Sequence, residues 1–441
     1  MLSESHRVDL SKYLSEAVSG GYIDLRYQRE SSWQLALREE SFENIKGEEE
    51  FITCRAAQHG YGVASSTKAD ERSIRSIIAL AQKLSRLQKE SVNLAPVDIE
   101  YGRRRHLCAK VFEEDEAATL LTQIRSELKE KLGSSYARSE IVISHSIIRS
   151  HLVTCEGTDV YEEVPLTDMV IYLASRGFRT GYASSIVGGL GGFEVFASKD
   201  WGKIIEELAV RAVNQLQTTL LPPLLRGRHL KVVLNEEAAG ALAHEVAHLL
   251  ESRAWVNKMM GLDIAEDVKV VDDPTLPTGY GSFAWDCEGV SGRRKVLLSR
   301  DEVKGLHTRL TTSDGREAGN ARGERTLPTP SMSNIFFASS DWRFDEMIQD
   351  MRSGIYAEGV VRADIDLSDG TFELIPEIAY LVEDKELKKP IRWLRLRGEL
   401  TTILKRIDAV GRVVRLRPNF EKGSRISEGG PFIRVNGLQC G

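Results

Sequence analysis

The stretch AGALAHEVAHLLES, residues 239–252, places His244, Glu245 and His248 in the spacing H-E-x-x-H. Helix-forming alanines and leucines surround the motif, and the apolar run LKVVLN, typical of a buried strand, precedes it. Residues four apart on an α-helix share one face, so both imidazoles can point at one metal ion, with Glu245 on the flank. In zinc hydrolases this pattern holds the metal, and the glutamate takes a proton from water that the metal activates. The alternative is a helix whose histidines only pack or face solvent.

A catalytic zinc needs a third protein ligand. Glu266 lies 18 residues beyond His248, close to the spacing at which some H-E-x-x-H enzymes supply a glutamate from a second helix. Cys440, the penultimate residue, could supply a thiolate. Glu251, on the same helix as the histidines, is worse placed. The residues alone therefore leave the third ligand open.

The composition is that of a globular protein, with 41% hydrophobic and 28% charged residues in 441. A formal charge of −6 gives no overall attraction for nucleic acid, and we expect no nucleic-acid partner. The five cysteines are odd in number and scattered, which favours a reducing compartment. The N-terminus has no leader pattern and no stretch has the ~18 apolar residues that span a bilayer, so we expect a cytoplasmic protein without membrane contact.

The order of predicted elements indicates an α+β protein of three domains. Residues 1–100 and 101–222 each mix strand-like runs with amphipathic helices, among them the helix predicted at 114–132 and ended by Gly133. Pro222 and Pro223 mark a boundary. Residues 223–441 follow as a larger β-rich domain that carries the H-E-x-x-H helix.

With that helix identified, further segments resemble the TldD/PmbA family of zinc metalloproteases, on the TldD-like, catalytic side. The resemblance covers essentially the whole chain and is densest from about residue 230 onward. The supporting stretches are ALAHEVAHLLE (241–251), VKVVDDPT (268–275), DCEGVSG (286–292), AGNARGE (318–324), LPTPSMSN (327–334) and SGIYAEGVV (353–361).

The resemblance implies a three-part α+β architecture and cleavage of unfolded or short peptides, including the leaders of ribosomal peptide natural products. It implies a PmbA/TldE-like partner subunit in a heterodimer, with a homodimer as the alternative. It also implies that His244 and His248 bind Zn²⁺ and that Glu245 is catalytic.

Three departures from the family pattern stand out. The usual spacing is H-E-x-x-x-H, one residue longer than here. A ligand cysteine is usual in a loop near the C-terminus, where this chain reads RLRPNFEKGSRIS (415–427), with Asn419 or Phe420 near that position. Cys440, Glu266 or Glu421 would then substitute, or a partner chain contributes, or zinc is bound weakly. Ser331 replaces a usual basic residue, which affects contacts with substrate or backbone there.

The segments LPTPSMSN and GIYAEGVV have two readings. Extended and weakly charged, they could line a groove where a peptide adds as a strand. They could equally be interior β-structure. On the first reading the substrate-binding residues are Pro330, Met332, Asn334, Gly354 and Tyr356.

The sequence thus predicts a zinc-dependent peptidase. The alternative is a catalytically impaired scaffold or specificity subunit of a TldD/PmbA-type complex, which the missing loop cysteine favours and the intact H-E-x-x-H opposes. A nucleic-acid-associated regulator is a third reading, drawn from a description of the family as gyrase modulators, and the acidic charge balance opposes it.

Overall fold

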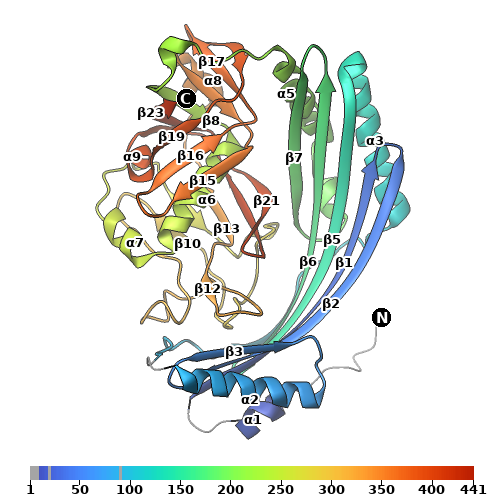
Figure 1. Cartoon of the computed structure of the whole chain (residues 1–441), viewed down its shortest axis with the longest axis vertical. Coiled ribbons are helices and arrows are strands. Elements are labelled where there is room, and N and C mark those ends of the chain that lie inside the picture. Colours follow the sequence, from blue (N-terminus) through green and yellow to red (C-terminus); the bar gives the residue numbers. More distant parts are fainter. Residues whose placement is uncertain (1–8, 18–20, 89–91) are drawn as a thin grey trace.

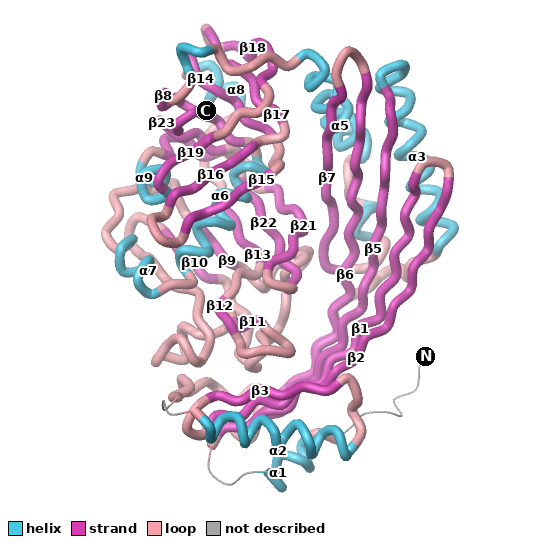
Figure 2. The backbone as a smooth tube through the Cα atoms, viewed as in Figure 1, coloured by secondary structure: helices cyan, strands magenta, loops and turns pink. Residues whose placement is uncertain are grey.

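The computed structural model describes residues 9–17, 21–88 and 92–441 as a mixed α+β, sheet-rich protein (Figure 1). The expectation that the chain has no leader concerns residues 1–8 among others, and residues 1–8 lie outside the described residues. No helix within the described ranges combines the length and apolar character needed to cross a membrane. The tube view separates a long curved sheet from a second body of shorter strands and loops (Figure 2).

The long sheet has seven strands in the order β3-β2-β1-β5-β6-β4, with β7 paired to β6. Its strands are β1 (Tyr22–Arg38), β2 (Ser41–Ala57), β3 (Tyr61–Ser66), β4 (Tyr101–Arg105), β5 (Tyr136–Thr154), β6 (Asp159–Arg176) and β7 (Thr180–Leu190). Strand β1 pairs with β5 from Asp24↔Thr154 to Arg38↔Glu140. Segments 1–100 and 101–222 therefore share one sheet, and the division of the chain into three domains stays a prediction.

Helices cover one face of this sheet at each end. The helices of this half are α1 (Ser11–Ala17), α2 (Glu71–Leu87), α3 (Glu114–Leu132), α4 (Glu194–Ala197) and α5 (Trp201–Asn214), with single 3-10 turns at Gly133–Ser135, Gln215–Gln217 and Pro223–Leu225. Helix α3 ends at Gly133, whose φ of 50° favours glycine, as the sequence predicts. Helices α3 and α5 bury the inward residues of β6 and β7, such as Ile171 and Ala183. The alternate residues Tyr172 and Tyr182 face the second body because strand side chains alternate.

The C-terminal body contains a nine-stranded sheet, a five-stranded sheet and a two-stranded ribbon. The nine-stranded sheet comprises β8 (Arg228–Leu234), β14 (Ser353–Glu358), β15 (Arg362–Asp366), β16 (Thr371–Ile375), β17 (Ile378–Glu383), β18 (Glu386–Ile391), β19 (Leu396–Glu399), β20 (Ile407–Val410) and β23 (Ile433–Cys440). The five-stranded sheet comprises β9 (Val270–Asp272), β10 (Lys295–Leu298), β13 (Asn334–Phe337), β21 (Arg415–Glu421) and β22 (Ser424–Gly430). The two-stranded ribbon comprises β11 (Ala321–Arg322) and β12 (Thr329–Pro330). Its helices are α6 (Glu236–Leu250), α7 (Arg253–Met259), α8 (Phe344–Gln349) and α9 (Leu400–Lys405).

Helix α6 packs against strands of both large C-terminal sheets, and its apolar residues lie in the main core. The side chain of Asn235 accepts a hydrogen bond from the backbone N–H of Ala238 and caps the helix. Gly240 lets α6 approach β22 closely, because a Cβ there would lie 2.6 Å from Cα of Gly429. The helix with its histidines is therefore held rigidly between the sheets.

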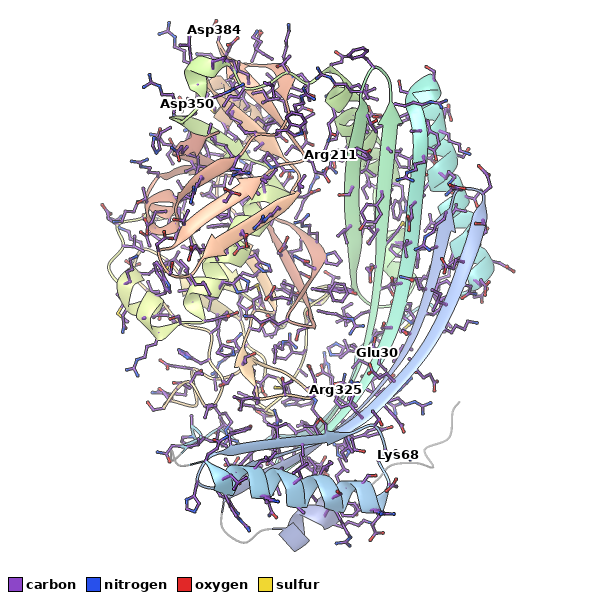
Figure 3. All side chains as sticks on the ribbon, in the orientation of Figure 1. Glu30, Lys68, Arg211, Arg325, Asp350 and Asp384 are labelled. Atoms are coloured by element: carbon purple, nitrogen blue, oxygen red, sulfur yellow. The ribbon has the colours of Figure 1, made fainter. Side chains whose placement is uncertain are left out.

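Buried and partly buried ion pairs connect the two bodies. Arg211 of α5 lies between them (Figure 3) and contacts Glu377 at 2.9 Å, Glu237 of α6 at 3.5 Å and Glu358 of β14 at 3.9 Å. Arg425 of β22 pairs with Glu30 of β1. These contacts hold one face of the long sheet in place across from α6.

Candidate metal centre

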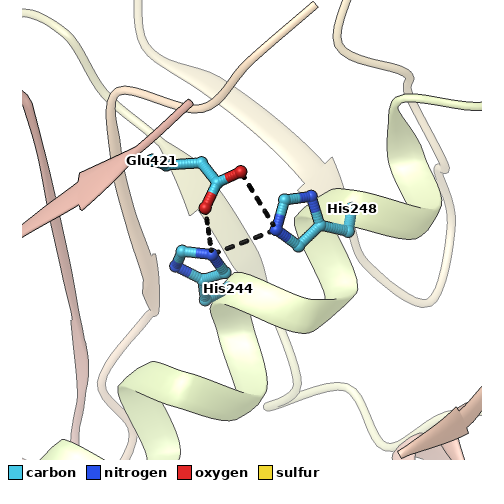
Figure 4. Close-up of side chains that lie close together, drawn as sticks. All are labelled: His244, His248 and Glu421. Atoms are coloured by element: carbon cyan, nitrogen blue, oxygen red, sulfur yellow. Dashed lines mark hydrogen bonds and ion pairs between the residues drawn. The ribbon is translucent and has the colours of Figure 1, made fainter. Parts of the chain in front are cut away.

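Helix α6 and strand β21 bring two imidazoles and a carboxylate together (Figure 4). The Nε2 atoms of His244 and His248 lie 3.1 Å apart. Carboxylate oxygens of Glu421 lie 3.4 Å from Nε2 of His244 and 3.7 Å from Nε2 of His248. Among the described residues, these three form the one group of His, Cys, Asp and Glu side chains with ligand atoms close enough to share a metal ion.

The separations of these atoms fit a zinc ion. Zinc binds histidine nitrogen and carboxylate oxygen at about 2.0–2.2 Å in tetrahedral geometry, which places neighbouring ligand atoms roughly 3.3 Å apart. The measured separations of 3.1, 3.4 and 3.7 Å bracket that value. The donor set, two imidazoles and one carboxylate, is also that of catalytic zinc sites with a position left for water.

A second carboxylate orients His244 from behind. Oε2 of Glu428 on β22 lies 2.8 Å from Nδ1 of His244. Arg417 donates two hydrogen bonds to the other oxygen of Glu428, and the side-chain amide of Asn419 donates to Oε2. A carboxylate on Nδ1 fixes the tautomer that leaves the Nε2 lone pair toward the ion.

The electrostatics of this cluster favour a cation. Burial alone would lower the pKa of His244, but hydrogen bonds to Glu421 and Glu428 raise this pKa to about 10. Although burial acts to raise the pKa of Glu428, Arg417 and His244 lower it to about 2. The two carboxylates are thus held ionised around the imidazoles, and a divalent ion would replace the proton there.

Glu245 lies on the flank of the same helix face and lines a cavity of about 620 Å³ together with His244, His248 and Glu421. It is 7% exposed, and burial raises the pKa of its carboxyl group, opposed by the two histidines. A buried carboxylate with a raised pKa beside a metal site suits a group that accepts and returns a proton. The cavity leaves space for a water molecule and a peptide beside it.

The two other ligand candidates lie outside this cluster. Cys440 is buried in β23, where its thiol donates to the backbone oxygen of Leu438. Glu266 is exposed in the loop between α7 and β9. Glu251, which the sequence made a worse candidate for the third ligand, lies 3.4 Å from Nδ1 of His248, on the side of that ring away from the Nε2 of His244.

Of the five residues named for a peptide groove, four are buried and Pro330 is partly buried, so these five do not line a groove. Val360 and Val361, at the end of the second segment, do line the cavity at the cluster. Met332 and Asn334 are fully buried, and the amide of Asn334 bonds the backbone oxygen of Asp273. Strand β14, with Gly354 and Tyr356, is paired on both sides, by β8 and β17, so it has no free edge for a substrate strand. Pro330 pairs within the β11–β12 ribbon. None of the five named residues lines the cavity at the cluster. Ser331 is also buried, with its backbone N–H bonded to the oxygen of Asn320.

The sequence contained a signal that would have favoured Glu421 over the other candidates for the third ligand. Arg417, Asn419 and Glu421 alternate along β21, so they share one strand face, and that face meets α6. Arg417 pairs in register with Glu428 of β22. Polar residues at every second position of a strand lie on one face, and this pattern would have indicated that face as a source of further site residues.

Proteins named metalloproteases are among the relatives of this chain. Residues 227–441 match the family described as PmbA/TldA metallopeptidase C-terminal domain. A metalloprotease of Methanocaldococcus jannaschii is 27% identical over 419 residues, which cover 89% of this chain and 90% of that protein. A protein of Saccharolobus solfataricus named zinc metalloprotease TldD homolog is 23% identical over 455 aligned residues, covering 98% and 99% of the two chains.

The fold itself recurs in solved structures. TldE from Thermococcus kodakarensis superposes with a TM-score of 0.76 at 16% identity, covering 98% of this chain and 99% of that one. Residues 227–441 thus match the C-terminal domain of the PmbA/TldA metallopeptidases, and the chain is similar along nearly its whole length to proteins named metalloproteases.

Proposed function

We propose that this protein is a zinc-dependent peptidase that hydrolyses peptide bonds in unfolded or short peptides, leader peptides of modified peptides among them. The observation that carries the proposal is the cluster of His244, His248 and Glu421 beside Glu245 in one cavity. The relatives named metalloproteases support it.

Each residue has a defined task in this proposal. His244, His248 and Glu421 hold the ion, and Glu428 orients His244. When bound, zinc supplies the Lewis acidity that activates water and polarises a peptide carbonyl. The Glu245 carboxylate takes a proton from the attacking water and later donates it to the leaving amine. Burial keeps the pKa of Glu245 raised, so the carboxylate is basic enough for this transfer.

The proposed assembly is a heterodimer with a PmbA/TldE-like subunit, with a homodimer as the alternative. The name and fold of the TldE neighbour support a partner of that kind. Light scattering of the purified chain, alone and with such a subunit, measures this directly.

The test of the catalytic role is Glu245→Gln. This change keeps the shape of the side chain and removes its proton acceptor, so zinc content should stay near one per chain while hydrolysis of an unfolded peptide falls at least ~100-fold. Wild-type turnover in the variant would remove Glu245 from the mechanism. A wild-type protein that binds no zinc would instead support the scaffold alternative.

A further inference from the structure

The cavity at the metal centre adjoins a larger one of about 1210 Å³. Four residues line both: Tyr172 and Ser184 of the long sheet, and Val360 and Val361 between β14 and β15. The larger cavity lies where β6 and β7 face the C-terminal body (Figure 1). A chain bound across the metal centre would therefore extend into it. We call this larger cavity the aromatic–arginine cleft, after Tyr172, Tyr182, Trp393, Arg138, Arg179 and Arg392.

Three aromatic side chains stand exposed in the cleft. Tyr172 is 53% exposed, Tyr182 60% and Trp393 74%. The tyrosines lie on neighbouring strands, on the face opposite the helices, so nothing in the fold of this chain covers them. Aromatic surface gathered in a concave site marks a place where a ligand docks.

The backbone of Trp393 is strained. Its φ of 56° is an outlier for a bulky residue. The guanidinium of Arg392 lies 4.1 Å from the centre of the indole ring and fixes its orientation. On the other side, Leu394 is buried in the core. The loop between β18 and β19 thus presents a preset indole to the cleft.

The cleft also has unpaired positive charge. Arg138, Arg179 and Arg392 form no ion pair with any carboxylate among the described residues. Two of the three glutamates in the lining already have partners, since Glu140 pairs with Arg38 and Glu377 with Arg211. The third, Glu39, lies exposed at the rim. Carboxylates of a ligand are the natural partners of these arginines.

We propose that the aromatic–arginine cleft binds a segment of the peptide substrate that carries aromatic side chains flanked by carboxylates, away from the bond that is cut. This rests on the proposed peptidase function for the nature of the substrate, because the cleft shares four lining residues with the cavity at the metal centre. It adds a sequence preference that the zinc site cannot provide. Aromatic rings of the peptide stack on Tyr172, Tyr182 and Trp393, and its carboxylates pair with the arginines.

The test is direct binding to the full chain treated with a chelator, so that no hydrolysis takes place. The probe is a fluorescein-labelled peptide of about twelve residues, ~40 Å when extended, with alternating glutamate and phenylalanine. One matched peptide has lysine for glutamate, and another has serine for phenylalanine. Anisotropy should show the acidic aromatic peptide binding about tenfold or more tightly than either, and losing affinity as salt rises.

Variants then locate the binding. Trp393→Asn, which tolerates a positive φ, should weaken binding about tenfold, and Trp393→Phe should restore most of it. Arg138→Gln combined with Arg179→Gln should weaken binding and flatten the salt dependence. The controls, Phe178→Ala and Arg300→Gln, alter an exposed aromatic and an exposed arginine outside the cleft and should leave the affinity unchanged.

Equal affinity for the three peptides, or unchanged affinity in the Trp393→Asn protein, would overturn the proposal. A shift of oligomeric state in Trp393→Asn without a change in peptide affinity would assign the aromatics to contact with a second copy and would overturn it too. Selective binding by a protein that hydrolyses no peptide would support the cleft and reject the proposed function. Hydrolysis without selective binding would support the proposed function and reject the binding role of the cleft.

Discussion

Replacing Glu421 with glutamine tests which residue completes the metal site. The change keeps the size of the side chain but removes the one carboxylate that contacts both Nε2 atoms, at 3.4 and 3.7 Å. Loss of a residue that only orients a ligand lowers metal affinity 10–100-fold. Loss of a ligand should therefore cost at least ~100-fold, or about 3 kcal/mol of binding free energy.

The assay is a zinc titration of the purified chain against a chromophoric chelator of known affinity. Glu266→Gln and Cys440→Ala are the matched controls, because both residues were ligand candidates and both lie outside the cluster. Their zinc affinity should equal that of the wild type. A Glu421→Gln protein that binds zinc as tightly as the wild type, or a Cys440→Ala protein that keeps its fold and loses zinc, would refute the assignment.

Three further changes test the surroundings of the site. Glu428→Gln should weaken zinc binding 10–100-fold in the same titration, because the carboxylate on Nδ1 of His244 is lost; an unchanged affinity would deny Glu428 its orienting role. Burial raises the pKa of Asp168 to about 6, so the folded state holds that proton more tightly than the unfolded state does. The free energy of unfolding of the wild type should therefore fall by about 2 kcal/mol relative to that of Asp168→Asn as pH rises from 4 to 6, and an unchanged difference between the two proteins would contradict this. Gly240→Ala should lower the free energy of unfolding, measured in urea, by roughly 1–2 kcal/mol, because the added methyl group would collide with Gly429 and this outweighs the better helix propensity of alanine. A stabilised variant would show that α6 and β22 leave room for the methyl group.

The sequence was most informative where structure is local. His244 and His248 lie one turn apart on helix α6, where short-range patterns alone had indicated a helix. The end of α3 at Gly133 was likewise predictable. The mixed α+β class followed from the same short-range patterns.

Long-range pairing was beyond the same reasoning. Nothing in residues 1–222 showed that β1 would pair with β5, since both strands read equally well as parts of separate sheets. Glu421 could be named only as one of several substitutes for the missing cysteine, because its position depends on how the β21–β22 hairpin packs on α6. The sequence left a groove and interior β-structure equally open for the segment at 353–361, because the strands on both sides of β14, β8 and β17, lie outside that segment.

The separation of the site residues along the chain has a consequence for biosynthesis. His244 and Glu428 are 184 residues apart, and Glu421 belongs to the same late hairpin. On the ribosome, α6 therefore emerges long before the strands that complete its ligand set and cover its flank. Contacts that distant form slowly. A nascent chain thus has both imidazoles before Glu421 and Glu428 are beside them, so the proposed zinc site, and any hydrolysis that depends on it, would have to wait until the hairpin has been translated and docked.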